Sequence, residues 1–512
     1  MSHCSTLKTL LLVIGLLCFS SSIFSQTQKE PKFGKIKLSQ LQKEKDDKFP
    51  DAHAVVLFDY GVSYYRYDAV SRTLKLNYER HTAIQFFDNT KFDLATFEIP
   101  LYHVSGHGET LRKIKAYTYN IVDGEMERTK FSKKDIVKEK ITDYLDKKKF
   151  TLTNVKEGSI IEVKYSVASD FATYMKPWYF QRKVPVRYSE YNIDVPEFFI
   201  FNKSMSGYFA PYIKPVKKNS RNDYLMISQG WAMKNLPAFE EERYMRSYKN
   251  YISKIEFELR SIRYPWGEVE NLIKSWEDIR DDLYRNGDFG KEIKKGKKVE
   301  SIVEQFKEGS EKERMVAIYE YVKTHMKWNG RKSEMSYQGV KKSLEKAEGT
   351  SGDINILLAA ALRKAGFKVT PVILSTRDNG MLPYAPTVRK INYMIVKVDI
   401  GDKTFYLDAT DDFFPAGLLP IRCFNGNAII LGEKETKKVE VKPTFGKKFV
   451  TQNILNLEED GVLKGVIKKT KSGYAALDFR EEYSEATDED AFVEDLQNKT
   501  EGLTIESHEI EN

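Results

Sequence analysis

The chain has 512 residues, of which 41% are hydrophobic and 13% aromatic; this composition provides room for about three domains with packed cores and excludes wholesale disorder. The formal net charge of +8 at pH 7 is spread along the sequence with Lys and Glu interleaved, as on solvated surfaces. This pattern argues against a nucleic-acid-binding protein.

The first 26 residues have the pattern of a secretory signal peptide. Lys8 supplies the positive charge, Leu10–Phe19 the apolar segment, and Ser25 a small residue before the expected cleavage. The apolar segment is shorter than the roughly 18 residues that a membrane span needs. A lipoprotein anchored through Cys18 is an alternative, but Leu17 is larger than the residue that lipoprotein processing normally requires there. We therefore expect residues 1–25 to be a signal peptide and the product to be exported, with no membrane span.

Residues 26–50 are polar and aperiodic, which predicts a linker or a tether packed on the first domain. From 51 to 235 the sequence predicts short strands, including Ala54–Phe58, Ser63–Tyr67 after Gly61, and Leu74–Tyr78. Thr151–Val167 reads as a strand, a turn and a second strand. Short strands with regularly spaced turns favour a β-sandwich over 51–235.

Three segments of this region, His53–Leu57, Asn154–Glu162 and Trp231–Ala238, resemble an uncharacterised β-domain. That domain precedes transglutaminase-like domains in exported proteins of Gram-negative bacteria, so the resemblance implies a periplasmic or envelope-associated location. It implies no activity, because the β-domain has no assigned chemistry.

Helical patterns follow the β-region. Lys254–Arg260 is interpreted as a strand-like bridge leading out of the sandwich. Ser275–Asp278 has the spacing of a capping box at the start of a helix. Lys312–Trp328 has apolar residues at helical intervals, and His325 near its end is interpreted as a helix-end histidine rather than a catalytic one.

The stretch Glu348–Leu374 contains the most distinctive pattern in the chain. Gly349–Asp353 predicts a turn and a helix start with a negative charge where the helix dipole favours one. Ile354–Ala365 is apolar nearly all round, with Asn355 an exception near its start, so we expect a helix buried on every side. Val369–Leu374 then predicts a strand.

A buried helix whose start carries G-x-C-x-D, followed by L-x-x-A-G and a strand, resembles the core of the transglutaminase-like superfamily, which shares its fold with papain-type cysteine proteases. Ile391–Val398 is similar to the family strand H-A-W-V-x-V, and Phe405–Thr410 to its strand W-x-x-x-D-P-T. Order and spacing match over about residues 310–412, and we assign 262–412 to this domain. The expected fold class is therefore α+β multidomain: an N-terminal β-sandwich, a central transglutaminase-like core and the start of a C-terminal β-domain.

The resemblance places the family's catalytic Cys at Ser351, its His at Asn392 and its Asp at Asp408. The family's chemistry needs a thiolate beside an imidazolium. A serine hydroxyl has no such route here, because Asn is not a general base. We therefore interpret the domain as having lost its triad.

Three functions remain open. The first is a non-catalytic protein that binds an extended polypeptide or glycan in the former cleft, where Asp353, Arg377, Tyr384 and Arg389 are the candidate contacts beside Asn392. The second is a transferase or hydrolase that uses Ser351 or a recruited histidine; the candidate histidines are His325, His81, His103 and His107. The third is an envelope scaffold without a ligand, which a flat or filled groove at the triad positions would favour.

No metal or cofactor is predicted. His103 and His107 are four residues apart, but Gly106 argues for a loop and no third ligand is evident. The sequence has no Walker-type loop and no dinucleotide fingerprint. It does not indicate an oligomeric state.

Residues 445–512 return to alternating patterns, which predict a partial β-domain too small to close a sandwich. We expect either that the chain is incomplete at this end or that a partner supplies strands. Cys423 is the only cysteine that remains after the leader, so no intrachain disulfide is possible, and its apolar neighbours favour a buried structural thiol.

Overall fold

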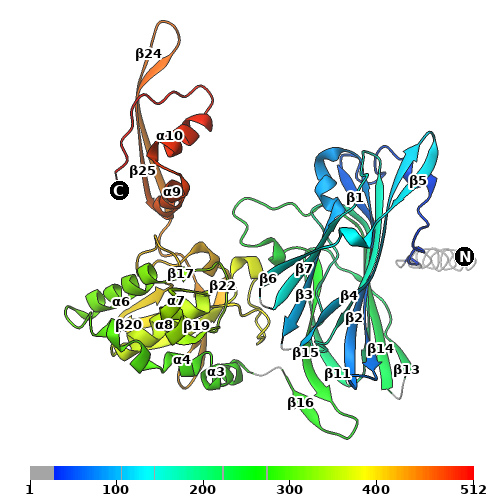
Figure 1. Cartoon of the computed structure of the whole chain (residues 1–512), viewed down its shortest axis with the longest axis horizontal. Coiled ribbons are helices and arrows are strands. Elements are labelled where there is room, and N and C mark those ends of the chain that lie inside the picture. The colour runs from blue at the N-terminus through cyan, green and yellow to red at the C-terminus, as the bar shows by residue number, and fades with distance from the viewer. Residues whose placement is uncertain (1–27, 105, 143, 222–223, 273–274, 512) are drawn as a thin grey trace, which may run out of the picture. The chain divides into compact units, whose positions relative to one another are not determined.

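The computed structural model describes residues 28–104, 106–142, 144–221, 224–272 and 275–511. The predicted signal peptide, residues 1–25, lies outside the described residues. The chain divides into two compact units, unit 1 ending at residue 273 and unit 2 beginning at residue 274 (Figure 1). Across the described ranges, no helix is long and apolar enough to cross a membrane.

Unit 1 consists mainly of strands. They are β1 (Ala54–Asp68), β2 (Thr73–Phe86), β3 (Thr96–Val104), β4 (His107–Val122), β5 (Glu125–Lys130), β6 (Val137–Thr142), β7 (Leu145–Thr151), β8 (Ile160–Ser169), β9 (Trp178–Tyr179), β10 (Val186–Pro196), β11 (Phe199–Ser206), β12 (Tyr212–Ile213), β13 (Lys217–Arg221), β14 (Tyr224–Leu236), β15 (Lys254–Arg263) and β16 (Val269–Asn271). A large sheet has the order β12-β14-β10-β1-β2-β8-β4-β3-β7-β6, and a smaller sheet has the order β11-β15-β16 with β9 paired to β15.

The first strand is longer than the sequence predicts. Ala54–Phe58 and Ser63–Tyr67 are parts of one strand, β1, which pairs with β2 along its length. Gly61 does not make a turn between them. It lies where the Trp178 ring packs on the strand, and a Cβ at this position would be 2.4 Å from that ring. A close approach by an aromatic ring, rather than a bend, therefore explains the glycine.

The two sheets pack face to face around an aromatic core. Trp178 stacks on Tyr191 of β10 with ring centroids 5.2 Å apart, and Phe257 of β15 lies against Tyr191 and Trp231. The segment interpreted as a bridge, Lys254–Arg260, is instead part of β15, a central strand of the smaller sheet. Its alternating apolar side chains are buried in the core, and unit 1 therefore extends past residue 235.

Residues 28–50, here called the strap, lie on the outer face of the large sheet. Ile36 and Leu41 of the strap, the latter at the end of helix α2 (Leu38–Leu41), are buried with Phe58 and Tyr188 of the sheet. Further along the strap, Asp46 forms a salt bridge with Arg187 of β10. Both faces of the sheet are therefore covered here, which explains why β1 has buried side chains on both sides.

Unit 2 is mixed. Its helices are α3 (Trp276–Arg285), α4 (Gly290–Ile293), α5 (Glu300–Val303), α6 (Glu311–His325), α7 (Gly339–Lys346), α8 (Ser351–Lys364), α9 (Tyr474–Glu485) and α10 (Glu489–Asn498). Its strands are β17 (Lys327–Trp328), β18 (Glu348–Gly349), β19 (Lys368–Leu374), β20 (Tyr393–Ile400), β21 (Lys403–Leu407), β22 (Gly426–Leu431), β23 (Thr436–Val441), β24 (Lys447–Leu457) and β25 (Leu463–Gly473). The predicted capping box at Ser275 is present and begins α3.

Helix α8 is the centre of unit 2, as predicted. Every residue from Ser351 to Leu362 is buried, because α4 to α7 surround the helix and β19 and β20 lie beneath it. The helix predicted over Lys312–Trp328 ends earlier, at His325, and Lys327–Trp328 forms β17, which pairs with β18 just before α8.

An antiparallel sheet in the order β21-β20-β19-β22-β23 supports α8. Alternate side chains of β20 face opposite sides: Met394 and Val396 lie in the core with α8, whereas Tyr393 and Ile395 lie in a second core. That second core is closed by the segment 413–424 and by Tyr474 of α9. The sheet thus continues through β22 and β23, beyond residue 412.

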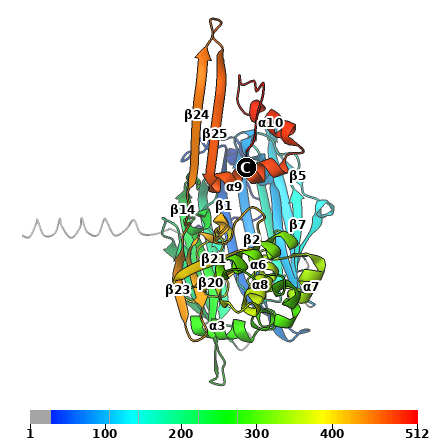
Figure 2. The same ribbon diagram turned by 90° about the vertical axis from the view of Figure 1, so that its left-hand side faces the viewer.

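The strands β24 and β25 form a two-stranded ribbon that extends from the sheet (Figure 2). Helix α9 packs against the ribbon near its base, and Lys471 lies over the Phe479 ring at 4.2 Å. Nearly all side chains of the ribbon are exposed, including large apolar ones: Phe449, Ile454, Leu457, Leu463 and Val466. The predicted partial β-domain corresponds to this ribbon with α9 and α10.

Candidate functional site

The start of α8 is held by a capping box between Thr350 and Asp353. The Thr350 side chain accepts from the Asp353 N–H, while the Thr350 N–H and hydroxyl donate to Asp353 Oδ2, both at 2.9 Å. This cap makes Ser351 the first residue of the helix.

The second carboxylate oxygen of Asp353 holds the preceding loop. Asp353 Oδ1 accepts hydrogen bonds from the Ser336 hydroxyl at 2.5 Å and from the backbone N–H groups of Tyr337 and Gln338. Asp353 is only 1% exposed. Asp353 is predicted from the sequence as a cleft contact, but its carboxylate is occupied by the helix cap and the loop.

The Ser351 hydroxyl is sealed beneath the same loop. Ser351 Oγ donates to the Ser333 carbonyl at 3.0 Å and accepts from the Ser333 N–H at 2.9 Å, and the residue is 0% exposed. The next residue, Gly352, allows the close contact, because a Cβ there would lie 2.0 Å from the Met335 carbonyl oxygen. Ser351 is therefore a buried structural hydroxyl.

Asn392 is bound to a different loop. Its Oδ1 accepts from the Thr376 N–H at 2.9 Å, and its Nδ2 donates to Thr376 Oγ1 at 2.8 Å. The amide thus fixes the loop that leaves β19. Among the described residues, no hydrogen bond joins Asn392 to Ser351 or Asp408, so the three positions do not form a connected triad.

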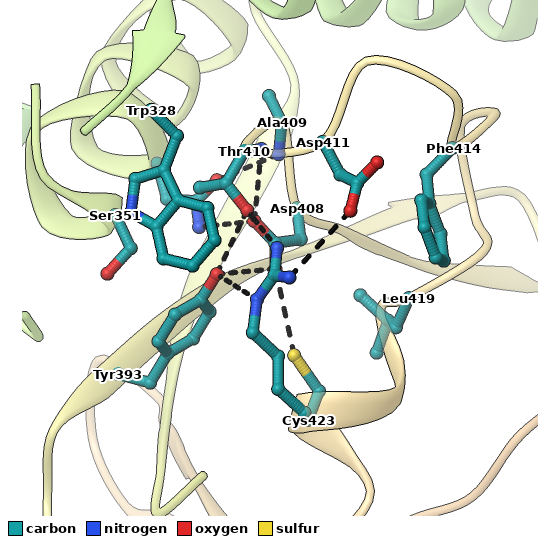
Figure 3. Close-up of polar contacts among 12 residues, drawn as sticks. Trp328, Ser351, Tyr393, Asp408, Ala409, Thr410, Asp411, Phe414, Leu419 and Cys423 are labelled. Carbon is teal, nitrogen blue, oxygen red and sulfur yellow. Dashed lines mark hydrogen bonds and ion pairs between the residues drawn. The ribbon is translucent and has the colours of Figure 1, made fainter. Parts of the chain in front are cut away.

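Asp408 lies at the centre of a buried network at the end of β21 (Figure 3). Its Oδ1 accepts from Asn355 Nδ2 at 2.9 Å and from the Thr410 hydroxyl at 2.8 Å, and its Oδ2 accepts from the Tyr393 hydroxyl at 2.9 Å. The side chain is 0% exposed. Asn355 also accepts from the Ala409 N–H, which ties α8 to the segment after β21.

Arg422 supplies the positive charge of this network. Its guanidinium donates to the Tyr393 hydroxyl at 3.0 Å and to Thr410 Oγ1 at 2.5 Å, and it lies 3.9 Å from Asp408 Oδ2. The Trp328 ring covers the guanidinium at 4.4 Å. Figure 3 shows the Ser351 hydroxyl directed away from this group. Burial raises the pKa of Tyr393 well above its usual range, so the phenol stays protonated and donates.

Cys423 lies beside Asp408. Its Sγ lies 3.6 Å from Asp408 Oδ2 and is buried. Burial raises the pKa of the thiol well above its usual value, and the charge of Asp408 acts in the same direction. The thiol is therefore not a thiolate nucleophile at neutral pH.

The candidate histidines lie elsewhere. His325, at the end of α6, is hydrogen-bonded to the Tyr321 carbonyl and stacks on the Tyr321 ring at 3.8 Å. His81, His103 and His107 belong to unit 1. Within the described ranges, none of these histidines is hydrogen-bonded to Ser351.

His103 and His107 lie on β3 and β4, which meet in a hairpin rather than a simple loop. His103 Nε2 lies 3.4 Å from Asp146 Oδ2. Over the residues that the structure describes, no group of three or more His, Cys, Asp or Glu side chains is arranged to hold a metal.

The loop 375–392 carries the other candidate contacts. Arg377 Nε donates to the Phe424 carbonyl at 3.0 Å, and the Arg389 N–H donates to Thr387 Oγ1. Tyr384 is 87% exposed, with Lys438 Nζ over its ring at 4.2 Å. Tyr384 therefore differs from the triad positions in being open to solvent.

Sequence reasoning missed Asn355, Tyr393 and Arg422 as members of the network. Asn355 did carry a signal, because it is a polar residue inside an otherwise apolar buried helix and must find hydrogen-bond partners. Arg422 carried none, since it lies in a loop segment with no periodic pattern.

Comparisons with known proteins agree with this fold. Residues 108–240 match the model of a domain of unknown function with solved structures, DUF3857, and residues 300–406 match the model of the transglutaminase-like superfamily. No curated protein matches the chain.

Two solved structures resemble the chain. One, described as a putative protease from Parabacteroides distasonis, is 18% identical, with a TM-score of 0.54 over 77% of this chain and 72% of that one. The other, described as a putative nutrient binding protein from Legionella pneumophila, is 8% identical over 62% of this chain and 94% of that one, and its TM-score of 0.19 supports no argument. The family models and the first structure confirm the expected fold class, with a transglutaminase-like core preceded by the uncharacterised β-domain.

Proposed function

We propose that the transglutaminase-like domain of this chain is non-catalytic and that the protein acts in the cell envelope as a structural or binding component. The observation that carries the proposal is the Ser351 hydroxyl, which is fully buried and engaged as both donor and acceptor with the backbone of Ser333.

The chemistry of the family requires a nucleophile that loses its proton to a neighbouring base. The Ser351 hydroxyl donates a hydrogen bond to the Ser333 carbonyl rather than to a base. Asn392, which occupies the base position, is hydrogen-bonded to Thr376, and its amide cannot accept a proton at neutral pH. The positive end of the α8 dipole contributes on the order of 1 kcal/mol, far too little to ionise an alcohol. A filled site at these positions also favours a scaffold over a ligand-binding cleft there.

A serine-reactive fluorophosphonate probe tests the accessibility of Ser351. We expect no adduct on Ser351 in intact-protein mass spectra, while an active serine hydrolase in the same reaction is labelled. A stoichiometric adduct that maps to Ser351 and disappears in Ser351→Ala would restore the enzyme hypothesis.

Binding of an extended polypeptide or glycan is the second candidate, and the exposed ring of Tyr384 favours it. An exposed aromatic face beside a cation, Lys438, suits a sugar ring or a peptide carrying an acidic group. The surface at Tyr384, not the buried triad, is then the place of contact.

Titration with soluble peptidoglycan fragments and with an unfolded polypeptide such as reduced casein tests this candidate. Tyr384→Ala is expected to weaken binding, and Tyr337→Ala, at another exposed aromatic residue that is 58% exposed, serves as the control. Equal binding by both variants and the unchanged protein would rule out the Tyr384 surface.

Export is the third part of the proposal and rests on the signal-peptide pattern of the first 26 residues. When the full-length gene product is made in a Gram-negative host, the protein is expected in the periplasmic fraction without residues 1–25. Recovery of the uncleaved chain in the cytoplasm would contradict this part alone.

A further inference from the structure

Unit 1 contains a cavity that lies far along the chain from the triad positions and that the proposed function does not use. It has a volume of about 650 Å³ and lies between the strap and the outer face of the large sheet. Small-molecule sites typically have volumes of about 300–1,000 Å³, so the cavity has the size of a ligand site.

The cavity has firm walls. Gln85, on the sheet side, donates from Nε2 to the backbone carbonyls of Gln40 and Lys43 in the strap. Arg187 of β10 donates to Asp46 at 2.8 Å, and Asp46 is buried. These contacts fasten the strap at both sides of the cavity, so the space is a built feature of unit 1.

The lining carries an excess of positive charge. The cationic side chains are Lys35, Lys37, Lys43, Arg187 and Lys234, and Asp46 is the acidic residue of the lining. Asp46 is already paired with Arg187, and Lys43 is paired with Asp47 outside the cavity. In the described part of the chain, the side chains of Lys35 and Lys37 have no acidic partner, so the lining is suited to a negatively charged group.

The floor of the cavity is apolar. Leu57 and Pro31 line it with partly exposed side chains, and the buried side chains of Ile36, Phe58 and Tyr188 also border it. The Tyr188 hydroxyl donates to Glu190 and accepts from the Gln28 N–H, and Lys234 Nζ lies over the ring at 5.9 Å, so the tyrosine offers the cavity no free polar atom. A cationic rim over an apolar floor matches a ligand with one charged end and one apolar end.

We propose that this cavity binds an amphipathic monoanion, a carboxylate with an aliphatic or aromatic body. The carboxylate lies between Lys35 and Lys37 at the rim, and the apolar body lies on Leu57 and Pro31. The proposal concerns unit 1 and does not depend on whether the transglutaminase-like domain is catalytic.

Isothermal titration of the full chain with decanoate tests the proposal. Decanoate is expected to bind. Decanol, which has the same chain without the charge, is expected to bind more weakly by a factor of about ten or more, and a factor of ten corresponds to about 1.4 kcal/mol. Inorganic phosphate, a charge without an apolar body, is expected not to bind. Equal binding of decanoate and decanol, binding of phosphate, or no heat with decanoate would each overturn the proposal.

Charge-reversal variants locate the site. The double variant Lys35→Glu with Lys37→Glu is expected to lose decanoate affinity by about tenfold or more. Lys32→Glu is the matched control, because Lys32 is an exposed strap residue outside the lining, and its affinity is expected to be unchanged. Both variants change exposed side chains, and circular dichroism checks that they fold. Equal loss in both variants would show a non-specific charge effect and overturn the assignment of the site.

Discussion

Ser351 stabilises the fold through two hydrogen bonds to one backbone unit. Ser351→Ala leaves the N–H and carbonyl of Ser333 without partners in a buried setting. The free energy of unfolding is expected to fall by about 1–3 kcal/mol, measured by urea denaturation. Ser301→Ala, at an exposed position on α5, is the control and is expected to change stability little. No difference between the two variants would contradict the structural role of Ser351.

Asp408 has a larger expected effect, because it opposes the buried charge of Arg422. Asp408→Asn removes the negative charge of the carboxylate. It also replaces one of the two oxygens that accept from the Tyr393 and Thr410 hydroxyls by an NH₂ group, which donates. We expect a loss of about 3–5 kcal/mol in unfolding free energy, as for other broken buried pairs. Asp402→Asn, in the exposed turn before β21, is the matched control. If Asp408→Asn lowered the unfolding free energy no more than Asp402→Asn does, the buried charge of Arg422 would not require Asp408.

At the scale of residues, the sequence located Ser351 at the start of a buried helix and Asp408 at the end of a strand, because cap spacing and apolar runs are local patterns. It did not predict what these side chains contact. Ser333 lies 18 residues before Ser351, and Arg422 reaches Asp408 from a loop in tertiary structure. Contacts of this kind depend on how the elements pack, which no local pattern records.

Among the elements, the strap carries a pH-sensitive contact. The His81 ring lies between Glu30 of the strap and Glu162 of β8, with both nitrogens 2.9 Å from carboxylate oxygens. Burial acts to lower the pKa of His81, but the hydrogen bonds to Glu162 and Glu30 outweigh it and raise the pKa above its ordinary value. The hydrogen bond from His81 lowers the pKa of Glu30 to about 2.

The raised pKa of His81 means that its contribution to docking is complete below the unfolded-state value, near 6.5, and is lost as pH rises through the higher folded-state value. For Glu30, the contribution is present above its ordinary value of 4.5 and is lost as pH falls toward 2. Hydrogen exchange of the Gly34 N–H, which donates to Glu162, measures docking after correction for intrinsic exchange. We expect protection to fall as pH rises above the ordinary histidine value of about 6.5.

His81→Gln is expected to remove this loss of protection with rising pH. His53→Gln, at an exposed histidine of unit 1 paired with Asp88, is the control and is expected to keep it. A Gly34 protection profile that is the same in all three proteins would show that His81 does not control docking.

Gly61 tests the packing of the two sheets. Gly61→Ala would place a methyl group within 2.4 Å of the Trp178 ring, and the ring cannot move without disturbing its stack on Tyr191. We expect a loss of about 1–3 kcal/mol or more in chemical denaturation. Gly287→Ala, where a Cβ meets nothing within 4 Å, is the control. Equal stability of the two variants would mean that the sandwich tolerates the added methyl.

At the scale of elements, the sequence predicted α3, α8 and β19 within a few residues, because each has a capping box or a continuous apolar run. It divided β1 at Gly61, since a glycine in a strand pattern normally signals a turn, a bulge or a close approach, and only the fold distinguishes them. It also misplaced Lys254–Arg260, because an alternating segment does not reveal which sheet it joins.

For the whole molecule, each unit has its own buried cores: unit 1 has an aromatic-rich core between its sheets and a smaller one under the strap, and unit 2 has one core on each side of its sheet. In calorimetry of the full chain, Gly61→Ala is therefore expected to lower the transition of unit 1, and Asp408→Asn that of unit 2. A single transition that both variants lower would show that the two units unfold as one cooperative unit and contradict this expectation.

The central claim is that the transglutaminase-like domain does not catalyse, and rates of transamidation and peptide hydrolysis test it most directly. The assay uses a glutamine-containing peptide with a fluorescent amine, and the same peptide alone, for the unchanged protein and for Ser351→Ala. We predict that both proteins give the rate of the buffer blank in both reactions. A rate above the blank that disappears in Ser351→Ala would contradict the account.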